Sequence, residues 1–355
     1  MKNKTHHILL AAIFISAIFV CSLATQAQNN KHYSIAIVGF YNLENLFDTI
    51  NDPTIDDEEF LPKSASHWNT EKYLHKLVNM SKVISKIGTD INPDGFAILG
   101  VSEIENKGVM EDLVNQALLK TRHLGIVHRD SPDRRGIDVG LLYNPKYFKV
   151  EAVKMCRLHI KDRPHFRTRD QMLVSGLLLG EKVYIIVNHW PSRYGGEKRS
   201  RPLRIAAANL SRHICDSLLR INKGAKIMVM GDLNDNPTNQ SVLVDMRAKG
   251  NINKLKGGDF FNPMNKLYKE GIGSTAWRDS WSLFDQILIS QGLVGKAKLT
   301  NGLKFYKSYI FNKPFMKQKD GKYKGYPYRT FAGGTWQGGF SDHFPAYVVL
   351  IKEVR

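Results

Sequence analysis

Five apolar runs in this chain each end at a cluster of side chains that bind metals or transfer protons. The clusters are Tyr-Asn-Leu-Glu-Asn at 41–45, Ser-Glu-Ile-Glu-Asn at 102–106, Asn-His-Trp-Pro-Ser-Arg at 188–193, Gly-Asp-Leu-Asn-Asp at 231–235 and Ser-Asp-His at 341–343. Because open α/β sheets bind ligands beyond one end of their strands, such clusters can converge in space. The pattern predicts one hydrolytic site.

The first two clusters offer oxygen ligands for a hard metal ion. Hydrolysis of a phosphate ester needs a cation to offset phosphoryl charge, an activated water and a proton for the leaving oxygen. Glu103 follows the apolar run 96–101 and could hold Mg²⁺ or a similar ion. Asn42 follows the run 36–40 and could assist as a neutral ligand or orient a phosphate. The alternatives are a solvated loop glutamate and a turn or cap asparagine.

The Gly-Asp-Leu-Asn cluster is a stronger signal. One residue separates Asp232 from Asn234, so an acid and an amide address the same small volume. We expect Asp232 to orient or deprotonate water and Asn234 to donate to phosphate. A simple Gly-Asp turn is the alternative, and it fits Asp235 better than it fits this pair.

Two histidines stand at the ends of apolar runs. His189 follows the run 184–187, and His343 adjoins Asp342, a possible metal ligand. Asp285, just before the apolar residues 286–289, could orient the His343 imidazole across a sheet. A lone histidine is usually structural, but two in this context favour proton transfer.

These residues, in this order, resemble the endonuclease/exonuclease/phosphatase superfamily, also called DNase-I-like. The resemblance covers residue 36 to the C-terminus and includes Asp285-Gln-Ile-Leu at 285–288. It implies a single domain, 28–355, in which two mixed β-sheets pack as a sandwich with helices on the outer faces. It also implies hydrolysis dependent on Mg²⁺ or Mn²⁺, by in-line attack of water on phosphorus.

The resemblance also implies roles for individual residues. Glu103 is similar to the principal metal carboxylate, with Asn42 and Asp342 close to the ion. His343, oriented by Asp285, is similar to the family's catalytic histidine.

Two further roles follow from the same resemblance. His189 is similar to the histidine that DNase-like members use as a general acid, which leaves the division of acid and base between the two histidines open. The segment 132–143 and Arg169 resemble parts that lie near the substrate phosphate, and Asp232 and Asn234 resemble the water-orienting and phosphate-binding pair. The cluster at 188–193 is closer to DNase-like and extracellular members than to exonuclease III-type nucleases.

Between the clusters, helical and strand patterns alternate. Helical spacing of apolar residues predicts helices over 68–87, 110–119 and 203–219. Further strands are expected at 139–143, 172–179, 284–289 and 346–351. The alternation predicts an α/β or α+β protein whose strands are covered by helices.

The chain is strongly basic. Its 355 residues include 51 Lys and Arg against 33 Asp and Glu, a formal net charge of +18. This surplus favours polyanionic partners such as nucleic acid or anionic lipid, although a merely solvated basic surface is the alternative. Basic and aromatic residues interleave over 296–329, where contact with nucleic acid and packing under a loop are equally good interpretations. A second basic cluster follows His189, and its first member, Arg193, is predicted to bind the substrate phosphate.

The first 27 residues are typical of a secretory signal. Lys2 and Lys4 precede the apolar stretch 8–20, and small residues stand near Ala27. A membrane anchor would need a longer apolar stretch, and a lipoprotein at Cys21 fits poorly after Val20. We therefore expect cleavage near Ala27 and an exported protein, periplasmic or secreted, with no transmembrane segment left.

Three minor features complete the sequence. Cys156 and Cys215 would remain after cleavage and could either pair or lie in the core. The acidic stretch 48–59 could bind a structural Ca²⁺, but it lacks the usual loop pattern, so a solvated loop is favoured. We expect a monomer.

Three classes of function fit these patterns. The first is an exported metal-dependent phosphodiesterase, an endonuclease acting on DNA or RNA. The second is a phosphatase or an esterase for phospholipids or small phosphoesters, sphingomyelinase-like or inositol-phosphate-like, because one catalytic core serves many substrates. A noncatalytic nucleic-acid binder is disfavoured, since no catalytic position is replaced.

Overall fold

Two large β-sheets dominate the computed structural model of the chain, which describes residues 32–295 and 302–354. The first sheet contains, in spatial order, β14 (Lys304–Ile310), β17 (Ala346–Val354), β1 (His32–Leu46), β2 (Ile98–Ile104), β4 (Asp138–Tyr143) and β3 (Gly125–His128). The second contains β5 (Phe148–Cys156), β6 (Gln171–Leu178), β7 (Glu181–His189), β8 (Lys226–Asp232), β13 (Asp285–Ser290), β10 (Phe260–Phe261) and β9 (Ala248–Lys249). Ser34–Lys352 form one compact unit.

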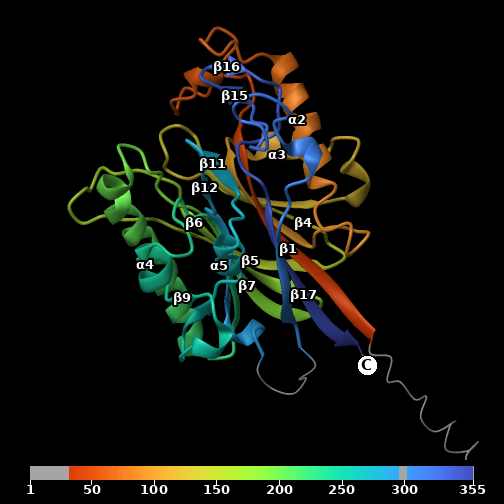
Figure 1. Cartoon of the computed structure of the whole chain (residues 1–355), viewed down its shortest axis with the longest axis vertical. Coiled ribbons are helices and arrows are strands. Elements are labelled where there is room, and N and C mark those ends of the chain that lie inside the picture. The colour runs from red at the N-terminus through yellow and green to blue at the C-terminus, as the bar shows by residue number, and fades with distance from the viewer. Residues whose placement is uncertain (1–31, 296–301, 355) are drawn as a thin grey trace, which may run out of the picture. The chain divides into compact units, whose positions relative to one another are not determined.

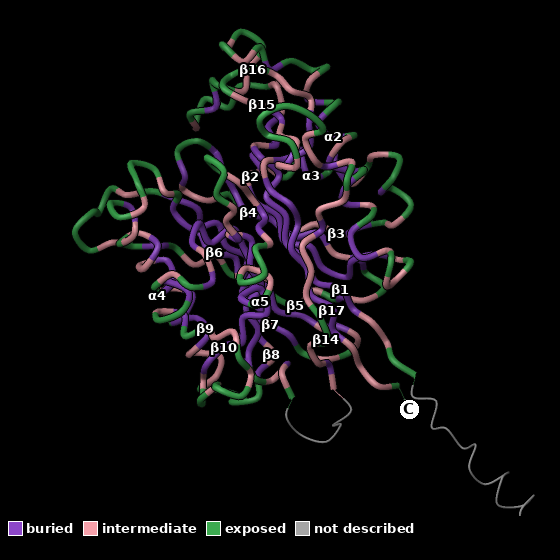
Figure 2. Tube along the Cα trace, in the orientation of Figure 1, coloured by how far each residue is buried: buried purple, intermediate pink, exposed green. Residues whose placement is uncertain are grey.

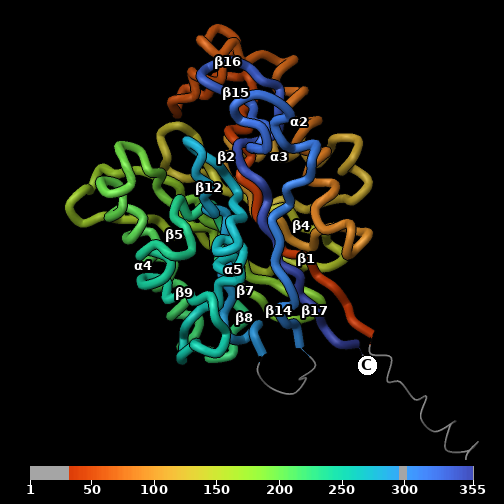
Figure 3. Tube along the Cα trace, in the orientation of Figure 1, coloured from red at the N-terminus to blue at the C-terminus, as the bar shows by residue number. Residues whose placement is uncertain are grey.

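Both sheets mix parallel and antiparallel pairs. β1 runs parallel to β2, and β7 runs parallel to β8, whereas β4, β6 and β13 pair antiparallel with their neighbours. β17, near the end of the chain, lies beside β1, near its start (Figure 3). These two parallel pairs are central in their sheets, as their continuous apolar runs predict. A short third parallel pair, β9 with β10, lies at the edge of the second sheet.

A continuous apolar core lies between the two sheets. Phe40 and Leu141 of the first sheet share it with Val187 and Met230 of the second, and all four are fully buried. Alternate residues of the same strands face outward, because successive side chains of a strand point to opposite faces. The buried segments in Figure 2 follow the two sheets.

Helices cover the outer face of each sheet. α2 (Thr70–Ile84) and α3 (Lys107–Val114) pack on the first sheet, where Met80 and Met110 join Tyr41 and Val101. α4 (Glu197–Ile221) packs on the second, where Ala208 contacts the same apolar cluster as residues of β7 and β8 (Figure 1). The predicted sandwich of mixed sheets with outer helices is confirmed.

Shorter elements connect these layers. α5 is Met264–Lys269, and two small hairpins pair β11 (Thr275–Trp277) with β12 (Ser280–Ser282) and β15 (Phe331–Ala332) with β16 (Thr335–Trp336). Short helical turns lie at Glu58–Phe60, Lys120–Arg122, Ser241–Asp245, Ile252–Lys254, Gln291–Leu293 and Pro314–Met316. Across 32–295 and 302–354, the helices are all too short or too polar to cross a membrane.

The structure bears on the predictions for the signal segment, the cysteines and the acidic stretch. The signal segment 1–27 lies outside the described residues. Both Cys156 and Cys215 carry free thiols, and Cys215 is a buried residue of α4 that packs in the apolar cluster beneath the helix. The acidic stretch 48–59 is a largely exposed loop in which the buried Asp57 accepts a hydrogen bond from the backbone of Asp52, with the oxygen 2.9 Å from the nitrogen.

Candidate active site

Strand register brings the predicted residues together. Parallel pairing of β7 with β8 places His189 beside Asp232, and antiparallel pairing of β13 with β8 places Asp285 on the other side of Asp232. In the first sheet, Asn42 of β1 is paired with Ser102 of β2, the residue before Glu103. The ends of strands from both sheets thus meet at one place, as predicted.

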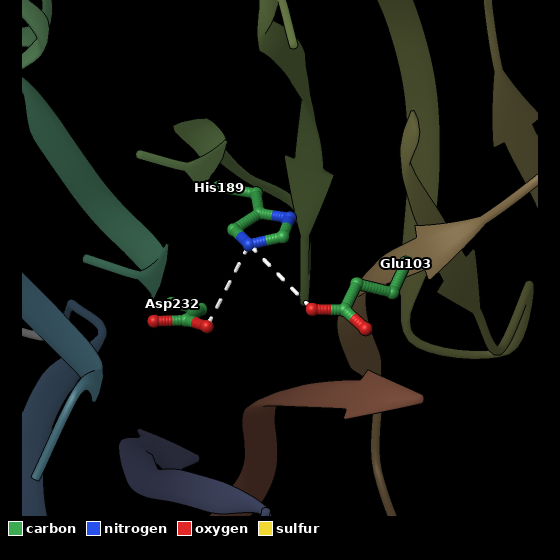
Figure 4. Close-up of side chains that lie close together, drawn as sticks. All are labelled: Glu103, His189 and Asp232. Atoms are coloured by element: carbon green, nitrogen blue, oxygen red, sulfur yellow. Dashed lines mark ion pairs between the residues drawn. The ribbon is translucent and has the colours of Figure 1, made fainter. Parts of the chain in front are cut away.

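Glu103, His189 and Asp232 form the centre of the site (Figure 4). The His189 Nε2 atom lies 3.7 Å from Glu103 Oε1 and 3.7 Å from Asp232 Oδ2. Asn42 joins the two carboxylates, because its side-chain nitrogen donates to Glu103 Oε1 at 2.9 Å and to Asp232 Oδ2 at 3.1 Å. One amide therefore links the two sheets at the site.

His343 enters the same site from the other side. Its Nδ1 lies 2.6 Å from Asp285 Oδ2, and its Nε2 lies 3.8 Å from Asp232 Oδ2. Ser341 fixes this turn, because its hydroxyl donates to the Asn42 carbonyl and accepts the His343 backbone N–H. A buried carboxylate on Nδ1 holds the imidazole with Nε2 directed at Asp232, the arrangement predicted for an acid–base histidine.

Burial gives the carboxylates of the site unusual proton affinities. Removal from water raises the pKa of Asp232 to about 7, and it raises the pKa of Glu44 to about 7, assisted by the charge of Asp342. Burial and Asp342 also raise the pKa of Glu103. A divalent cation would favour the ionised forms of this crowded acidic group.

The two histidines differ in their electrostatic surroundings. Burial lowers the pKa of His189 well below its usual value, and the nearby Arg169 guanidinium lowers it further. Burial opposes charge on His343 as well, but the carboxylates of Asp285, Asp342 and Asp232 together raise its pKa well above the usual value. The site therefore holds one imidazole that favours the neutral form and one that favours the protonated form.

The donor set fits a divalent metal ion. Glu103 and Asp342 line one cavity of about 400 Å³, which we call the catalytic pocket. The buried Asp342 Oδ1 atom has no hydrogen-bond partner among the described residues. Carboxylate oxygens are the ligands that Mg²⁺ and Mn²⁺ prefer. The Asn42 oxygen accepts the Glu44 backbone N–H at 2.9 Å, so its role as a metal ligand stays a prediction.

A polar network around Glu44 borders the catalytic pocket. Arg329 donates to Asp342 Oδ2 at 2.7 Å and to Glu44 Oε1 at 3.4 Å. The buried Lys76 of α2 donates to Thr330 Oγ1 at 2.6 Å, and the Thr330 backbone donates to Glu44. Sequence reasoning gave none of these residues a role. The Glu in Tyr-Asn-Leu-Glu-Asn was a usable signal, whereas Arg329 had none beyond the general basic surplus.

The predicted phosphate-binding residues make mainly structural contacts in this structure. Arg169 lines the catalytic pocket, but its guanidinium donates to the carbonyls of His189 and Trp190 and to Asp133. The Asn234 amide donates to the Trp190 carbonyl at 3.0 Å. These contacts fix the loop after β7, and phosphate binding by both residues stays a prediction.

Arg193 lies further from the catalytic pocket. Its guanidinium donates to the Asn234 carbonyl at 2.8 Å and to Asp235 at 3.0 Å, and it stacks over Phe284. These contacts stabilise the Gly-Asp-Leu-Asn-Asp turn from behind. Its predicted contact with the substrate phosphate also stays a prediction.

Replacing Gly231 by alanine is expected to lower the free energy of unfolding by about 1–3 kcal/mol. A Cβ atom at this position would lie 2.2 Å from the Asn188 carbonyl oxygen of the neighbouring strand. Urea denaturation measures the effect. Gly257→Ala is the matched control, since a Cβ there meets nothing within 4 Å. Equal stabilities of the two variants would contradict this reason for glycine.

Comparisons with known proteins agree with the fold. Solved structures share the fold at low sequence identity. One is an endonuclease/exonuclease/phosphatase family protein from Bacteroides thetaiotaomicron, with 16% identity and a TM-score of 0.54 over 92% of this chain and 98% of that one. A second is the mannosyl-6-phosphatase of the same organism, with 16% identity and a TM-score of 0.51 over 89% of this chain and 99% of that one. A comparison with curated proteins finds no match.

A third structure is a complex with nucleic acid. TDP2 of D. rerio, complexed with single strand DNA product, has 12% identity and a TM-score of 0.52 over 89% of this chain and 99% of that one. Fold and site together define a metal-dependent phosphoester hydrolase with a DNase-I-like sandwich. The family model of the endonuclease/exonuclease/phosphatase family matches residues 37–352, and the chain belongs to that family.

Proposed function

We propose that this chain is an exported phosphodiesterase that cleaves DNA or RNA. The observation that supports it best is an aromatic pocket of about 440 Å³ beside the catalytic pocket, with which it shares Arg329 and Gly333. Trp277 and Tyr323 line it and are 69% and 49% exposed. Large exposed rings beside a phosphoester site are suited to stacking on bases.

Cations accompany these rings. The Arg278 guanidinium lies 5.7 Å from the Trp277 ring centre, and Lys322 Nζ lies 5.7 Å from the Tyr323 ring centre. A ligand there would meet ring faces and positive charge together. This pocket contains one part of the basic and aromatic stretch 296–329, of which 296–301 lie outside the described residues. Tyr306 of β14 is 64% exposed and lies outside the pocket.

Three other rings of that stretch pack against the protein. Phe311 is buried in the core, Tyr309 stacks on Tyr347 at 4.9 Å, and Phe315 contacts Phe340 at 5.5 Å between ring centres. Packing under a loop describes these three rings, and we propose nucleic-acid contact only for the rings of the aromatic pocket.

In the proposed reaction, Glu103 and Asp342 would hold a divalent ion, Mg²⁺ or Mn²⁺, and such an ion would supply neutralisation of phosphoryl charge and assist water activation. Asp232 orients the attacking water. The Asp232 carboxylate is held in place by the Asn234 backbone N–H, which donates to Oδ1 at 2.9 Å. Asp285 keeps a proton on His343 Nδ1, which leaves His343 Nε2 free to exchange a proton with a reacting oxygen. His189 Nε2 exchanges a proton with the other reacting oxygen.

A phosphatase acting on a sugar phosphate is the second candidate. The likeness to the mannosyl-6-phosphatase supports it, as does the aromatic pocket, because exposed rings also pack on sugars. In that case the substrate would bind with its terminal phosphate in the catalytic pocket.

A substrate panel tests the proposed function. We expect purified mature protein with Mg²⁺ or Mn²⁺ to cleave single-stranded DNA or RNA with a higher kcat/KM than it shows for mannose 6-phosphate or sphingomyelin. Intact nucleic acid together with hydrolysed sugar phosphate would support the second candidate and reject the first. Hydrolysis of sphingomyelin alone would reject both.

Export is the remaining part of the proposal. The signal-like residues 1–27 support it, with cleavage near Ala27. N-terminal sequencing of protein recovered outside the cytoplasm should begin near Gln28. Recovery of the full chain in the cytoplasm, starting at Met1, would contradict this expectation.

A further inference from the structure

A strongly basic cleft lies beside the catalytic pocket, on the side of the loop that follows β7. It has a volume of about 720 Å³ and is bordered by the segments 133–135, 163–169 and 191–203. Six arginines line it: Arg134, Arg135, Arg163, Arg167, Arg169 and Arg199. Asp133 is the one carboxylate among the described residues that line this cleft. We refer to it as the basic cleft.

Half of these arginines have no side-chain partner among the described residues. The guanidinium groups of Arg134, Arg163 and Arg199 are exposed and form no hydrogen bond or ion pair with any described residue. Arg135 and Arg169 share the single carboxylate of Asp133. Uncompensated like charges in one concavity attract anions and repel one another, so the cleft is suited to a polyanion.

The segment that contributes Arg134 is held in place by buried contacts. Asp138 accepts hydrogen bonds from the Ser131 backbone at 2.9 Å and from the Ser131 hydroxyl at 2.5 Å. His128 Nε2 lies 3.0 Å from the same aspartate, and all three residues precede or follow the 132–137 turn. The cations are therefore presented on a fixed support.

The basic cleft is continuous with the catalytic pocket. Arg135, Arg169 and Ser192 line both cavities. A ligand with one phosphate at Glu103 and Asp342 would therefore pass directly into the cleft. The anion that the cleft accepts would belong to the same molecule as the phosphate that reacts.

An exposed aromatic ring in the basic cleft favours one class of polyanion, a single-stranded nucleic acid. Tyr194 lines the cleft and is 92% exposed, on a turn made by Gly195 and Gly196, which both have positive φ angles. Phe166 is a second ring in the same lining. Nucleobases of a single strand offer faces on which such rings stack, while a duplex keeps its bases stacked internally and a sulfated glycan has none.

We propose that the basic cleft binds backbone phosphates of a single-stranded polynucleotide on one side of the scissile phosphate, with Tyr194 stacking on a base. The inference rests on the proposed nuclease function and specifies its substrate as a strand that extends past the catalytic pocket. Arg134, Arg163 and Arg199 supply the charge.

Binding to an uncleavable strand tests the inference apart from catalysis. The probe is a fluorescent oligothymidylate of about twelve nucleotides with phosphorothioate linkages, followed by anisotropy with Mg²⁺ present over a range of KCl concentrations. Each lost phosphate contact on a single strand lowers the salt slope of log Kd by about 0.7. We expect the Arg134→Ala/Arg163→Ala/Arg199→Ala variant to lose about 2 from this slope and to bind at least about tenfold more weakly.

A matched control removes three cations elsewhere. Lys120, Arg220 and Lys223 are exposed and, like the three arginines replaced in the cleft variant, make no side-chain ion pair with described residues. Arg220 is at the opposite end of α4 from Arg199. The triple alanine control should keep the wild-type slope to within experimental error. An equal loss in the control, or none in the cleft variant, would overturn the proposal.

Two further arms separate alternatives. Tyr194→Ala should weaken oligothymidylate binding by about tenfold and leave heparin binding unchanged. If the cleft variant loses heparin binding but keeps oligothymidylate binding, the cleft serves a sulfated glycan and the proposal is wrong. Failure of the nuclease function would give a different result. In that case wild-type protein would still bind the uncleavable strand but would not cleave the ordinary phosphodiester strand.

Discussion

Replacing Asp232 or His343 by alanine is expected to lower kcat on the best substrate by about 10³-fold. Asp232 faces both histidines, with its Oδ2 atom 3.7 Å from His189 Nε2 and 3.8 Å from His343 Nε2, so its loss removes the group between them. His343 is the imidazole that the buried Asp285 orients. Steady-state kinetics with saturating substrate measure the change.

Controls for this prediction come from exposed residues of the same types. His213 on α4 is exposed, and the Asp130 side chain is 90% exposed, so His213→Ala and Asp130→Ala should keep wild-type kcat. Urea denaturation of each variant separates loss of chemistry from loss of fold. Retention of more than about a tenth of wild-type kcat in folded Asp232→Ala or His343→Ala would show that the site is wrongly assigned.

Removing divalent ions is expected to abolish activity, and adding Mg²⁺ or Mn²⁺ to restore it. Glu103 is crowded by the charge of Asp342, and Asp342 Oδ1 has no hydrogen-bond partner among the described residues. Binding is measurable without turnover, because ion present at about 100 times its Kd stabilises the fold by about 2.7 kcal/mol. Glu103→Gln should reduce this stabilisation, measured by thermal unfolding with and without Mg²⁺. Full activity in chelator would contradict metal dependence.

The pH dependence of stability in metal-free protein has a definite sign at Asp232. Its pKa is about 7 in the folded protein against an ordinary value of 3.8, so the folded state holds this proton more tightly. That contribution is complete below pH about 4 and is lost as the pH rises through about 7. The unfolding free energy of wild type minus that of Asp232→Asn should therefore fall over this window. A rise would show that the carboxylate is ionised and stabilising.

The central strands were predictable because each is a continuous apolar run. β7 and β8 are buried on both faces, so their sequences show no polar alternation and end abruptly at polar clusters. The resemblance then placed those clusters together. Register explains why this worked, since Asp285, Asp232 and His189 occupy matched positions on adjacent strands.

The edge strands were not predictable by the same rule. β5 and β14 lie at the edges of the two sheets, and their sequences contain several lysines at exposed positions instead of an apolar run. Charged edge strands avoid pairing with other chains, but the charges hide the strand from a search for apolar runs. Both strands were consequently missed.

The outer part of the site depends on long-range loop packing. Arg329 reaches Glu44 across 285 positions of the chain, and Lys76 is a helix residue that sequence alone would place in solvent. No periodicity predicts such contacts, because they depend on where the 317–340 loop folds back over β1. The basic cleft likewise unites three segments whose arginines are scattered in the sequence.

The most direct test of hydrolysis at this site is cleavage of a single-stranded oligonucleotide in water enriched in oxygen-18, with Mg²⁺ present and under single turnover. Attack of water on phosphorus at the Glu103, Asp232 and His343 site predicts one heavy oxygen in the phosphate of the product and none in the released hydroxyl, detected by mass spectrometry. His343→Ala should yield no labelled product on the same time scale. Label in the hydroxyl, or intact oligonucleotide with wild-type protein, would contradict it.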